Sequence, residues 1–179
     1  MPQVIINDEL MEAMEGEMVL DIARRHGAHI GFACDGRGFC QTCECRVLQG
    51  AEELCPPNHI EQRVFNPEAL EHGYRLACQA AVCGSGTAQV LTRAEELRRL
   101  AAMVVAPPAG TTAGYNLGRV LRSMGVLVAE RAMRVPAVLP MILPQLRAMP
   151  PHFPGIKNYV NDTKRVLQRT LKDKPNIPT

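Results

Sequence analysis

Aromatic residues are scarce in this chain of 179 residues: they make up 4% of it, with three Tyr, four Phe and no Trp. This composition argues against a platform that stacks nucleic-acid bases and against an aromatic-lined sugar cleft. No apolar run reaches about 18 residues, so the sequence does not predict a transmembrane helix. The opening MPQVIINDEL has acids where a secretory leader needs bases, and we therefore expect a reducing environment on the cytoplasmic side.

Motifs of enzymatic catalysis are also missing from the chain. There is no nucleophile placed beside a base, no phosphate-binding loop, and no nicotinamide or flavin fingerprint. A Rieske-type site needs two histidine ligands, but the five histidines are scattered and do not form such a pair. They are His26, His29, His59, His72 and His152.

Seven cysteines, all before residue 84, are the most informative residues present. Their odd number does not suit a closed disulfide framework and favours metal ligation. Cys34, Cys40 and Cys43 follow the pattern C-x5-C-x2-C, and Cys78 lies in the segment RLACQ. Four thiolates suit a [2Fe-2S] cluster, because two irons that share two sulfides need two protein sulfurs each. The alternative is a four-cysteine zinc site, which favours two C-x2-C knuckles where this chain has one.

Charge divides the chain into two parts. Residues 1–92 contain thirteen acids and six bases, for a net charge of −7, whereas residues 93–179 contain five acids and fourteen bases, for +9. Ten of the fourteen prolines follow residue 100. We predict a cysteine-bearing domain over 1–92, a spacer helix over 93–106, and a basic, proline-rich, amphipathic extension over 107–179.

Hydrophobic periodicity in residues 1–92 predicts a small α+β domain rich in strands. We expect a hairpin whose strands, 3–7 and 9–14, meet at a turn formed by Asn7 and Asp8. A helix over 18–26 is expected to end at Gly27, ahead of a glycine-rich loop over 27–43 that wraps a ligand. The remaining expected elements are strands over 45–48, 74–80 and 88–91 and a short helix over 60–65.

The segment GFACDGRGFCQTC, followed by GYRLACQ, resembles the [2Fe-2S] ferredoxins. Its five-residue first gap is similar to that of the adrenodoxin and putidaredoxin branch, whereas the plant-type branch has four residues there. The resemblance covers residues 1–92. It implies a β-grasp fold, a [2Fe-2S] cofactor and one-electron transfer rather than enzymatic catalysis. It also implies the cluster ligands Cys34, Cys40, Cys43 and Cys78.

Glycines in the cysteine loop support this interpretation. Gly31, Gly36 and Gly38 would let the backbone approach a cluster closely and offer N–H groups to its sulfurs. Since the fourth ligand lies far along the chain, cluster assembly would tie the loop to the sheet and contribute to folding.

Three cysteines and a group of acids have no role in the resemblance. We interpret Cys45, Cys55 and Cys83 as buried small residues or incidental thiols. The acids between the third and fourth ligands predict a docking face for basic partners, and the alternative is that they only keep the small domain soluble. These acids are Glu52, Glu53, Glu61, Glu68 and Glu71.

The extension shows helical periodicity over 117–135, although Arg131 intrudes on the apolar side. Pro136, Pro140 and Pro144 then recur in an apolar stretch, where we expect them to forbid a regular helix. Residues 155–172 return to helical spacing. Such a basic amphipathic segment suits an anionic membrane surface or a partner protein, and the alternative is a helical unit that wraps the acidic domain.

A ferredoxin domain with an apolar extension also resembles, in general plan, the iron-sulfur proteins of the chlorosome envelope in green photosynthetic bacteria. We therefore expect a one-electron carrier that residues 107–179 tether to a membrane surface or a larger redox or photosynthetic complex. Its partners are expected to be redox proteins and not nucleic acids. The alternatives are a structural or redox-sensing component of a large assembly and the ferredoxin component of a multicomponent oxygenase.

Overall fold

The computed structural model describes residues 1–146 and Lys164. Residues 1–92, here called the head, form a five-stranded sheet of order β2-β1-β5-β3-β4. β1 and β5 run parallel, and the other neighbouring strands run antiparallel. The strands are β1 (Gln3–Ile6), β2 (Glu9–Glu12), β3 (Glu44–Gln49), β4 (Tyr74–Leu76) and β5 (Thr87–Thr92).

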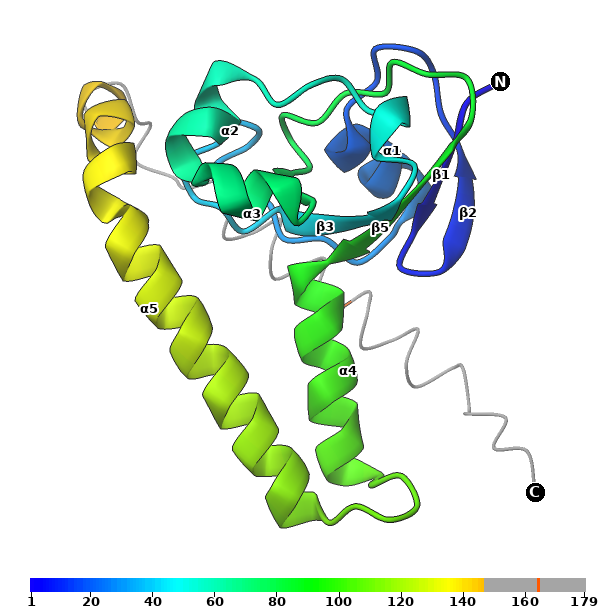
Figure 1. Cartoon of the computed structure of the whole chain (residues 1–179), viewed down its shortest axis with the longest axis vertical. Coiled ribbons are helices and arrows are strands. Elements are labelled where there is room, and N and C mark those ends of the chain that lie inside the picture. Colours follow the sequence, from blue (N-terminus) through cyan, green and yellow to red (C-terminus); the bar gives the residue numbers. More distant parts are fainter. Residues whose placement is uncertain (147–163, 165–179) are drawn as a thin grey trace.

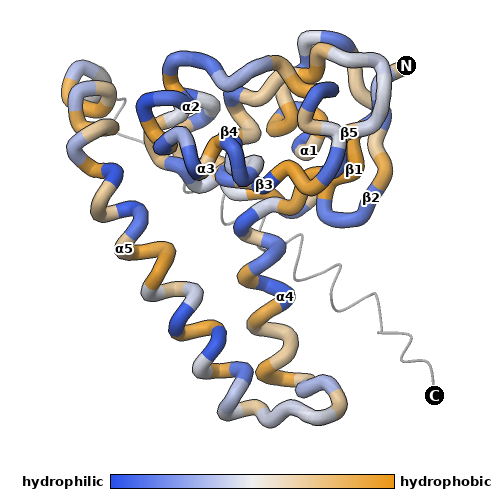
Figure 2. The backbone as a smooth tube through the Cα atoms, viewed as in Figure 1, coloured by the Kyte–Doolittle hydropathy of each residue, from blue (hydrophilic) through white to orange (hydrophobic). Residues whose placement is uncertain are grey.

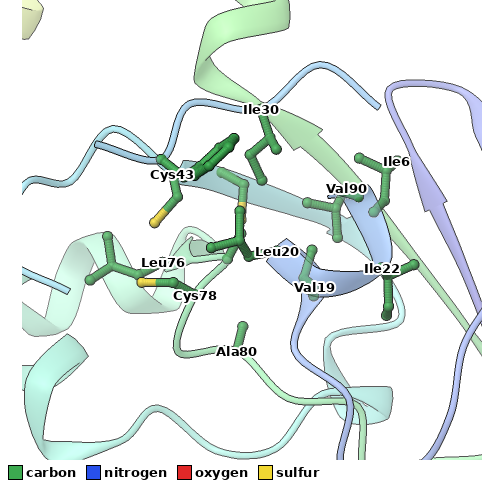
Figure 3. Packing of buried hydrophobic residues seen from close by; sticks show 14 of the residues in the cluster. Ile6, Val19, Leu20, Ile22, Ile30, Cys43, Leu76, Cys78, Ala80 and Val90 are labelled. Carbon is green, nitrogen blue, oxygen red and sulfur yellow. The ribbon is translucent and has the colours of Figure 1, made fainter. Parts of the chain in front are cut away.

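Helix α1 (Val19–His26) packs on this sheet and supplies much of the core. Its apolar face buries Val19, Leu20 and Ile22 against Ile6 and Val90 from the sheet (Figure 3). Burying each such side chain contributes about 1.5–3 kcal/mol to stability. A helix held on a mixed sheet confirms the α+β class and the β-grasp arrangement that the resemblance implied.

Turn chemistry places the ends of these elements where the sequence predicts them. Asn7 and Asp8 have φ of 55° and 70°, as a tight turn between β1 and β2 requires. Gly27 has φ of 77° and ends α1 in the left-handed conformation. Asn58 is the N-cap of α2 (His59–Val64), and its side chain accepts hydrogen bonds from the backbone N–H groups of Ile60 and Glu61.

Two short elements of the head were not expected from the sequence. They are the 3-10 turn η1 (Ala51–Glu53) and helix α3 (Pro67–Glu71). α3 has the usual signals of a helix start, because Asn66 caps it and Pro67 occupies its first turn. Its five residues are too few to show a helical period.

The strand expected over 74–80 is wrong in its second half. β4 ends at Leu76, and the chain then turns, so that the Leu76 carbonyl accepts hydrogen bonds from the N–H groups of Gln79 and Ala80. This turn carries Cys78 away from the sheet and toward the cysteine loop.

Beyond the head, α4 (Arg93–Val105) and α5 (Ala113–Leu146) form a helical hairpin. Figure 1 shows α4 leaving the end of β5 and α5 running back to the head beside α2. Near the connecting loop the buried Asn116 side chain donates to the Met103 carbonyl at 2.9 Å, which fixes α5 to α4. Within the described part of the chain no helix is long and apolar enough to cross a membrane.

The expectation that three prolines forbid a regular helix is wrong, because α5 continues through Pro136, Pro140 and Pro144. Their four-residue spacing places all three on one exposed row, where water can bond the carbonyls that lose an N–H partner. The opposite row packs on the head through Val138, which is 4% exposed. The helix expected over 155–172 lies outside the described residues.

Candidate metal centre

Cys34, Cys40, Cys43 and Cys78 lie together in the head as two thiol pairs. A hydrogen bond joins the thiols of Cys34 and Cys40, and another joins those of Cys43 and Cys78. In the first pair the shared hydrogen bond and burial both raise the pKa of Cys34, whereas for Cys40 the same hydrogen bond outweighs burial and lowers the pKa to about 5. In the second pair it raises the pKa of Cys43 and lowers that of Cys78.

Three of these cysteines come from the loop between α1 and β3, and Cys78 comes from the turn after β4. Figure 3 shows Cys43 and Cys78 beside Leu20 and Leu76, at the edge of the apolar core. Cys34, Cys43 and Cys78 are buried, and Cys40 is half-buried. The four sulfurs thus lie in a largely dry site that opens on one side.

Hydrogen-bond donors surround these sulfurs. The Thr42 hydroxyl shares a hydrogen bond of 3.1 Å with the Cys40 sulfur, and Gln79 Nε2 lies 3.5 Å from the Cys78 sulfur. Backbone N–H groups also bond the sulfurs, and Gly38 is the one of the three expected glycines among these donors. The N–H donors belong to Cys34, Gly38, Cys40, Thr42 and Cys78.

Two glycines are required by close contacts within the loop. A Cβ atom at Gly31 would lie 2.6 Å from the Thr42 carbonyl oxygen. Gly38 has φ of 78°, and a Cβ there would lie 2.6 Å from the Ile60 side chain. Both positions keep the loop folded back on the residues that bear the sulfurs.

A cavity of about 180 Å³ reaches the sulfur site from outside. Its lining includes Cys78 and Gly36 together with the charged residues Asp21, Arg24 and Asp35. Arg24 and Asp35 lie 3.9 Å apart. The cavity gives a partner or solvent a short approach to Cys78.

The donor set fits a two-iron cluster. Within residues 1–146 and Lys164, no three His, Cys, Asp or Glu side chains converge on a single-ion position. A [2Fe-2S] cluster does not need such a position, because each iron takes two protein sulfurs and two sulfides. The two thiol pairs, Cys34 with Cys40 and Cys43 with Cys78, would provide the four protein sulfurs that such a cluster needs.

Two arginines of α5 reach this loop, and sequence reasoning did not connect them with it. Arg131 Nη1 donates to the Cys40 carbonyl at 2.8 Å, and Arg131 Nη2 donates to the Gln41 carbonyl at 2.6 Å. Arg134 Nη1 lies 2.8 Å from Glu44 Oε2. The only signal in the sequence was that Arg131 interrupts the apolar side of its helix.

The interpretation of the other cysteines is confirmed for one and wrong for two. Cys45 is a buried thiol in β3 that donates to the Arg75 carbonyl at 3.6 Å. Cys55 and Cys83 are joined by a disulfide, with their Cα atoms 5.1 Å apart. An antiparallel bridge between Leu54 and Val82 brings the two segments together, and no local pattern in the sequence announces this contact.

The acidic docking face is also smaller than expected. Glu61 is fully buried and pairs with Arg75 at 2.9 Å, so it cannot meet a partner. Glu53 accepts a hydrogen bond of 2.8 Å from the Gly86 N–H. The acids that remain exposed are Glu52, Glu68 and Glu71.

Comparison with known proteins identifies the family of the head. The family described as "2Fe-2S iron-sulfur cluster binding domain" matches residues 4–83. 2Fe-2S ferredoxin-5 of Aquifex aeolicus is 36% identical over 90 residues, which are 48% of this chain and 93% of that protein. The chain belongs to the [2Fe-2S] ferredoxin family. The cofactor of this ferredoxin is therefore a [2Fe-2S] cluster, and its relatives are electron carriers.

Similarity extends beyond the head in another relative. Chlorosome protein J of Chlorobaculum tepidum is 39% identical to this ferredoxin over 123 residues, which are 67% of the chain and 55% of that protein. The chain thus spans about half the length of this relative. Among solved structures, an ISC-like [2Fe-2S] ferredoxin from Pseudomonas putida has a TM-score of 0.44 and 26% identity, and the match covers 51% of this chain and 91% of that one.

Proposed function

We propose that this ferredoxin carries single electrons on a [2Fe-2S] cluster held by Cys34, Cys40, Cys43 and Cys78, and that its helical hairpin attaches it to a lipid surface of a chlorosome-type assembly. The ligand set is supported by the pairing of these four thiols, of which Cys78 lines the polar cavity. When bound, the cluster supplies one-electron oxidation and reduction. The N–H groups around the sulfurs favour the more negative, reduced state.

The attachment is supported by one observation, an exposed apolar stripe on α5. The side chains of Leu121 and Val128 are 63% and 64% exposed, whereas large apolar side chains in a folded protein are usually at least partly covered. The stripe follows one side of the helix, and Figure 2 shows apolar segments on both α4 and α5 away from the head. Its members are Leu117, Leu121, Met124, Val128, Val135 and Leu139.

A lipid surface fits this stripe in charge as well as in polarity. Arg119 and Arg122 lie exposed on the same helix, and residues 93–179 have a net charge of +9. An apolar face with bases on the remaining faces of the same helix is typical of helices that lie in the interface of an anionic membrane, where each base contributes about 1 kcal/mol. The name of the relative chlorosome protein J supports a light-harvesting assembly as the location of that surface.

Vesicle binding tests this attachment. The full chain is sedimented with vesicles of phosphatidylglycerol and phosphatidylcholine, as the native sequence and as Leu121→Asp/Val128→Asp. The control is Leu10→Asp/Met14→Asp, which changes two residues of the head that are 61% and 59% exposed. We expect the α5 variant to bind at least about tenfold more weakly, since each buried side chain contributes about 1.5–3 kcal/mol. The control should bind as the native chain does.

Two results would contradict the lipid proposal. One is native chain that stays in the supernatant with these vesicles. The other is equal loss of binding in the α5 variant and in the head control, since binding would then not depend on the stripe.

A further inference from the structure

The second half of α5 closes over the loop that bears the cysteines. Arg131 bridges the carbonyls of Cys40 and Gln41 with two hydrogen bonds, of 2.8 and 2.6 Å. Gln41 has φ of 56°, a left-handed conformation that a residue with a side chain rarely adopts. The two bonds from Arg131 hold the backbone at this turn, between the second and third cysteines.

Arg134 completes the contact one turn later on the same helix. Its Nη1 atom donates to Gln41 Oε1 at 3.2 Å and to Glu44 Oε2 at 2.8 Å. The guanidinium also stacks 4.7 Å from the centre of the Phe65 ring. Arg134 therefore ties the helix to the loop and to the residue after α2 at the same time.

Glu44 makes this arginine pair electrostatically important. Its side chain is 1% exposed and directly follows Cys43, so it brings a buried negative charge to the edge of the sulfur site. Arg134 lies 2.8 Å and Arg131 3.7 Å from Glu44 Oε2. A buried carboxylate is costly unless a cation and hydrogen bonds compensate it. Both cations that form ion pairs with Glu44 come from α5, and Arg93 of α4 adds a longer-range attraction.

We propose that α5 is part of the iron-sulfur site: Arg131 and Arg134 are positioning residues that hold the ligand loop and place two positive charges beside it. The inference rests on the proposed ligand set but not on the attachment to lipid. Reduction adds one electron to the cluster and breaks no bond, so the site becomes more negative by one unit. Nearby guanidinium groups favour that state and therefore raise the reduction potential, and the held loop slows the release of iron.

Potentials and release rates of the holoprotein test this proposal. The full chain is compared with Arg131→Ala, Arg134→Ala, Arg131→Lys and Glu44→Gln, with Arg63→Ala as the control because Arg63 is an exposed base of α2. The potential is measured by dithionite titration followed by electron paramagnetic resonance. Iron release to a chelator is followed by the loss of visible absorbance.

We expect both alanine variants to lower the potential, by up to about 59 mV if the one-electron equilibrium shifts tenfold. Glu44→Gln should raise the potential, because that variant removes a negative charge.

Arg131→Ala should release iron about tenfold faster, the ratio that corresponds to about 1.4 kcal/mol. Arg131→Lys keeps the positive charge but cannot make both hydrogen bonds to the loop carbonyls. Its reduction potential should therefore stay near the native value, while its iron is released faster. Arg63→Ala should match the native chain.

Unchanged potentials in both alanine variants would overturn the proposal. So would shifts of the same sign in Arg134→Ala and Glu44→Gln, since a disrupted fold and not charge would then explain both. Failure of the ligand set is seen separately: if Cys40→Ser kept the native spectrum, the proposed ligands would be wrong whatever the arginine variants do.

Discussion

The Glu61 carboxylate and the Arg75 guanidinium face each other inside the head, joined by two hydrogen bonds of 2.9 Å. Glu61 Oε1 also accepts the Leu76 N–H at 2.9 Å, and Arg75 Nη2 donates to the Cys55 carbonyl at 3.0 Å. The pair thus fixes the end of β4 two residues before Cys78. Its role is to hold the strand that delivers the fourth thiol.

Breaking this pair should therefore destabilise the head. Glu61→Gln leaves Arg75 as a buried cation without its counterion, and we expect the free energy of unfolding to fall by about 3–5 kcal/mol. Urea unfolding of the holoprotein measures the loss. Glu68→Gln, on the exposed side of α3, should change it by less than about 0.5 kcal/mol. Equal unfolding midpoints for the two variants would contradict this role.

Stability should also depend on pH through Glu95 at the start of α4. Burial acts to raise the pKa of Glu95, but hydrogen bonds from Arg98, His29 and Arg99 outweigh it and hold the pKa well below its usual range. Because the folded pKa lies below the unfolded value of about 4.3, the ionised form stabilises the fold above that pH. This stabilisation is lost as the pH falls through the folded pKa.

The Glu95→Gln variant isolates this contribution. At pH 7 the free energy of unfolding of this variant should be about 1.5–3 kcal/mol lower than that of the native chain, because this is the usual contribution of hydrogen bonds to a charged group. The difference should shrink steadily as the pH falls below about 4. Glu15→Gln, at an exposed position, serves as the control. A difference that stays constant from pH 7 to pH 3 would show that the charge of Glu95 is not responsible.

The disulfide between Cys55 and Cys83 should contribute measurable stability. It closes a loop with a sequence separation of 28, for which chain entropy predicts about 3–4 kcal/mol. Cys55→Ser/Cys83→Ser should therefore unfold at a lower urea concentration and still bind the cluster. Mass spectrometry after alkylation checks the bond itself. Ready alkylation of both thiols in the native chain would refute it.

Because Gly31 lies so close to Thr42, the loop should not tolerate a side chain at position 31. Gly31→Ala would place a Cβ atom 2.6 Å from a backbone carbonyl, so we expect several-fold less iron per chain after reconstitution. Gly125→Ala on α5 meets nothing within 4 Å and should bind iron normally, with a gain of up to about 1 kcal/mol in stability. Equal iron contents would show that the loop can adjust.

Much of the head was predictable because its signals are local. Strand alternation, the Asn7-Asp8 turn and the glycine after α1 each depend on neighbouring residues. Apart from the end of β4, the structure has these elements within a residue or two of their predicted ends. The motif around Cys34, Cys40 and Cys43 is local as well. Its two thiol pairs match what a two-iron cluster requires.

The parts that could not be predicted depend on contacts between distant residues. The bonds from Arg131 to the cysteine loop span about ninety positions, and the partner of Cys55 depends on a bridge made by Leu54. The helix through Pro136 persists because its opposite row packs on the head, and local propensity contains no information on that packing. Glu61 belongs to an acid-rich segment, and only the fold shows that it is buried and paired with Arg75.

Electron paramagnetic resonance of dithionite-reduced full-length protein, with Cys78→Ser compared against Cys45→Ser, tests the proposed cluster most directly. Both changes replace a buried thiol, but only Cys78 pairs with Cys43. We predict that the native chain and Cys45→Ser show the same low-temperature signal, with one unpaired electron for two irons, and that Cys78→Ser loses or alters it. An unchanged signal in Cys78→Ser would contradict the four-cysteine site.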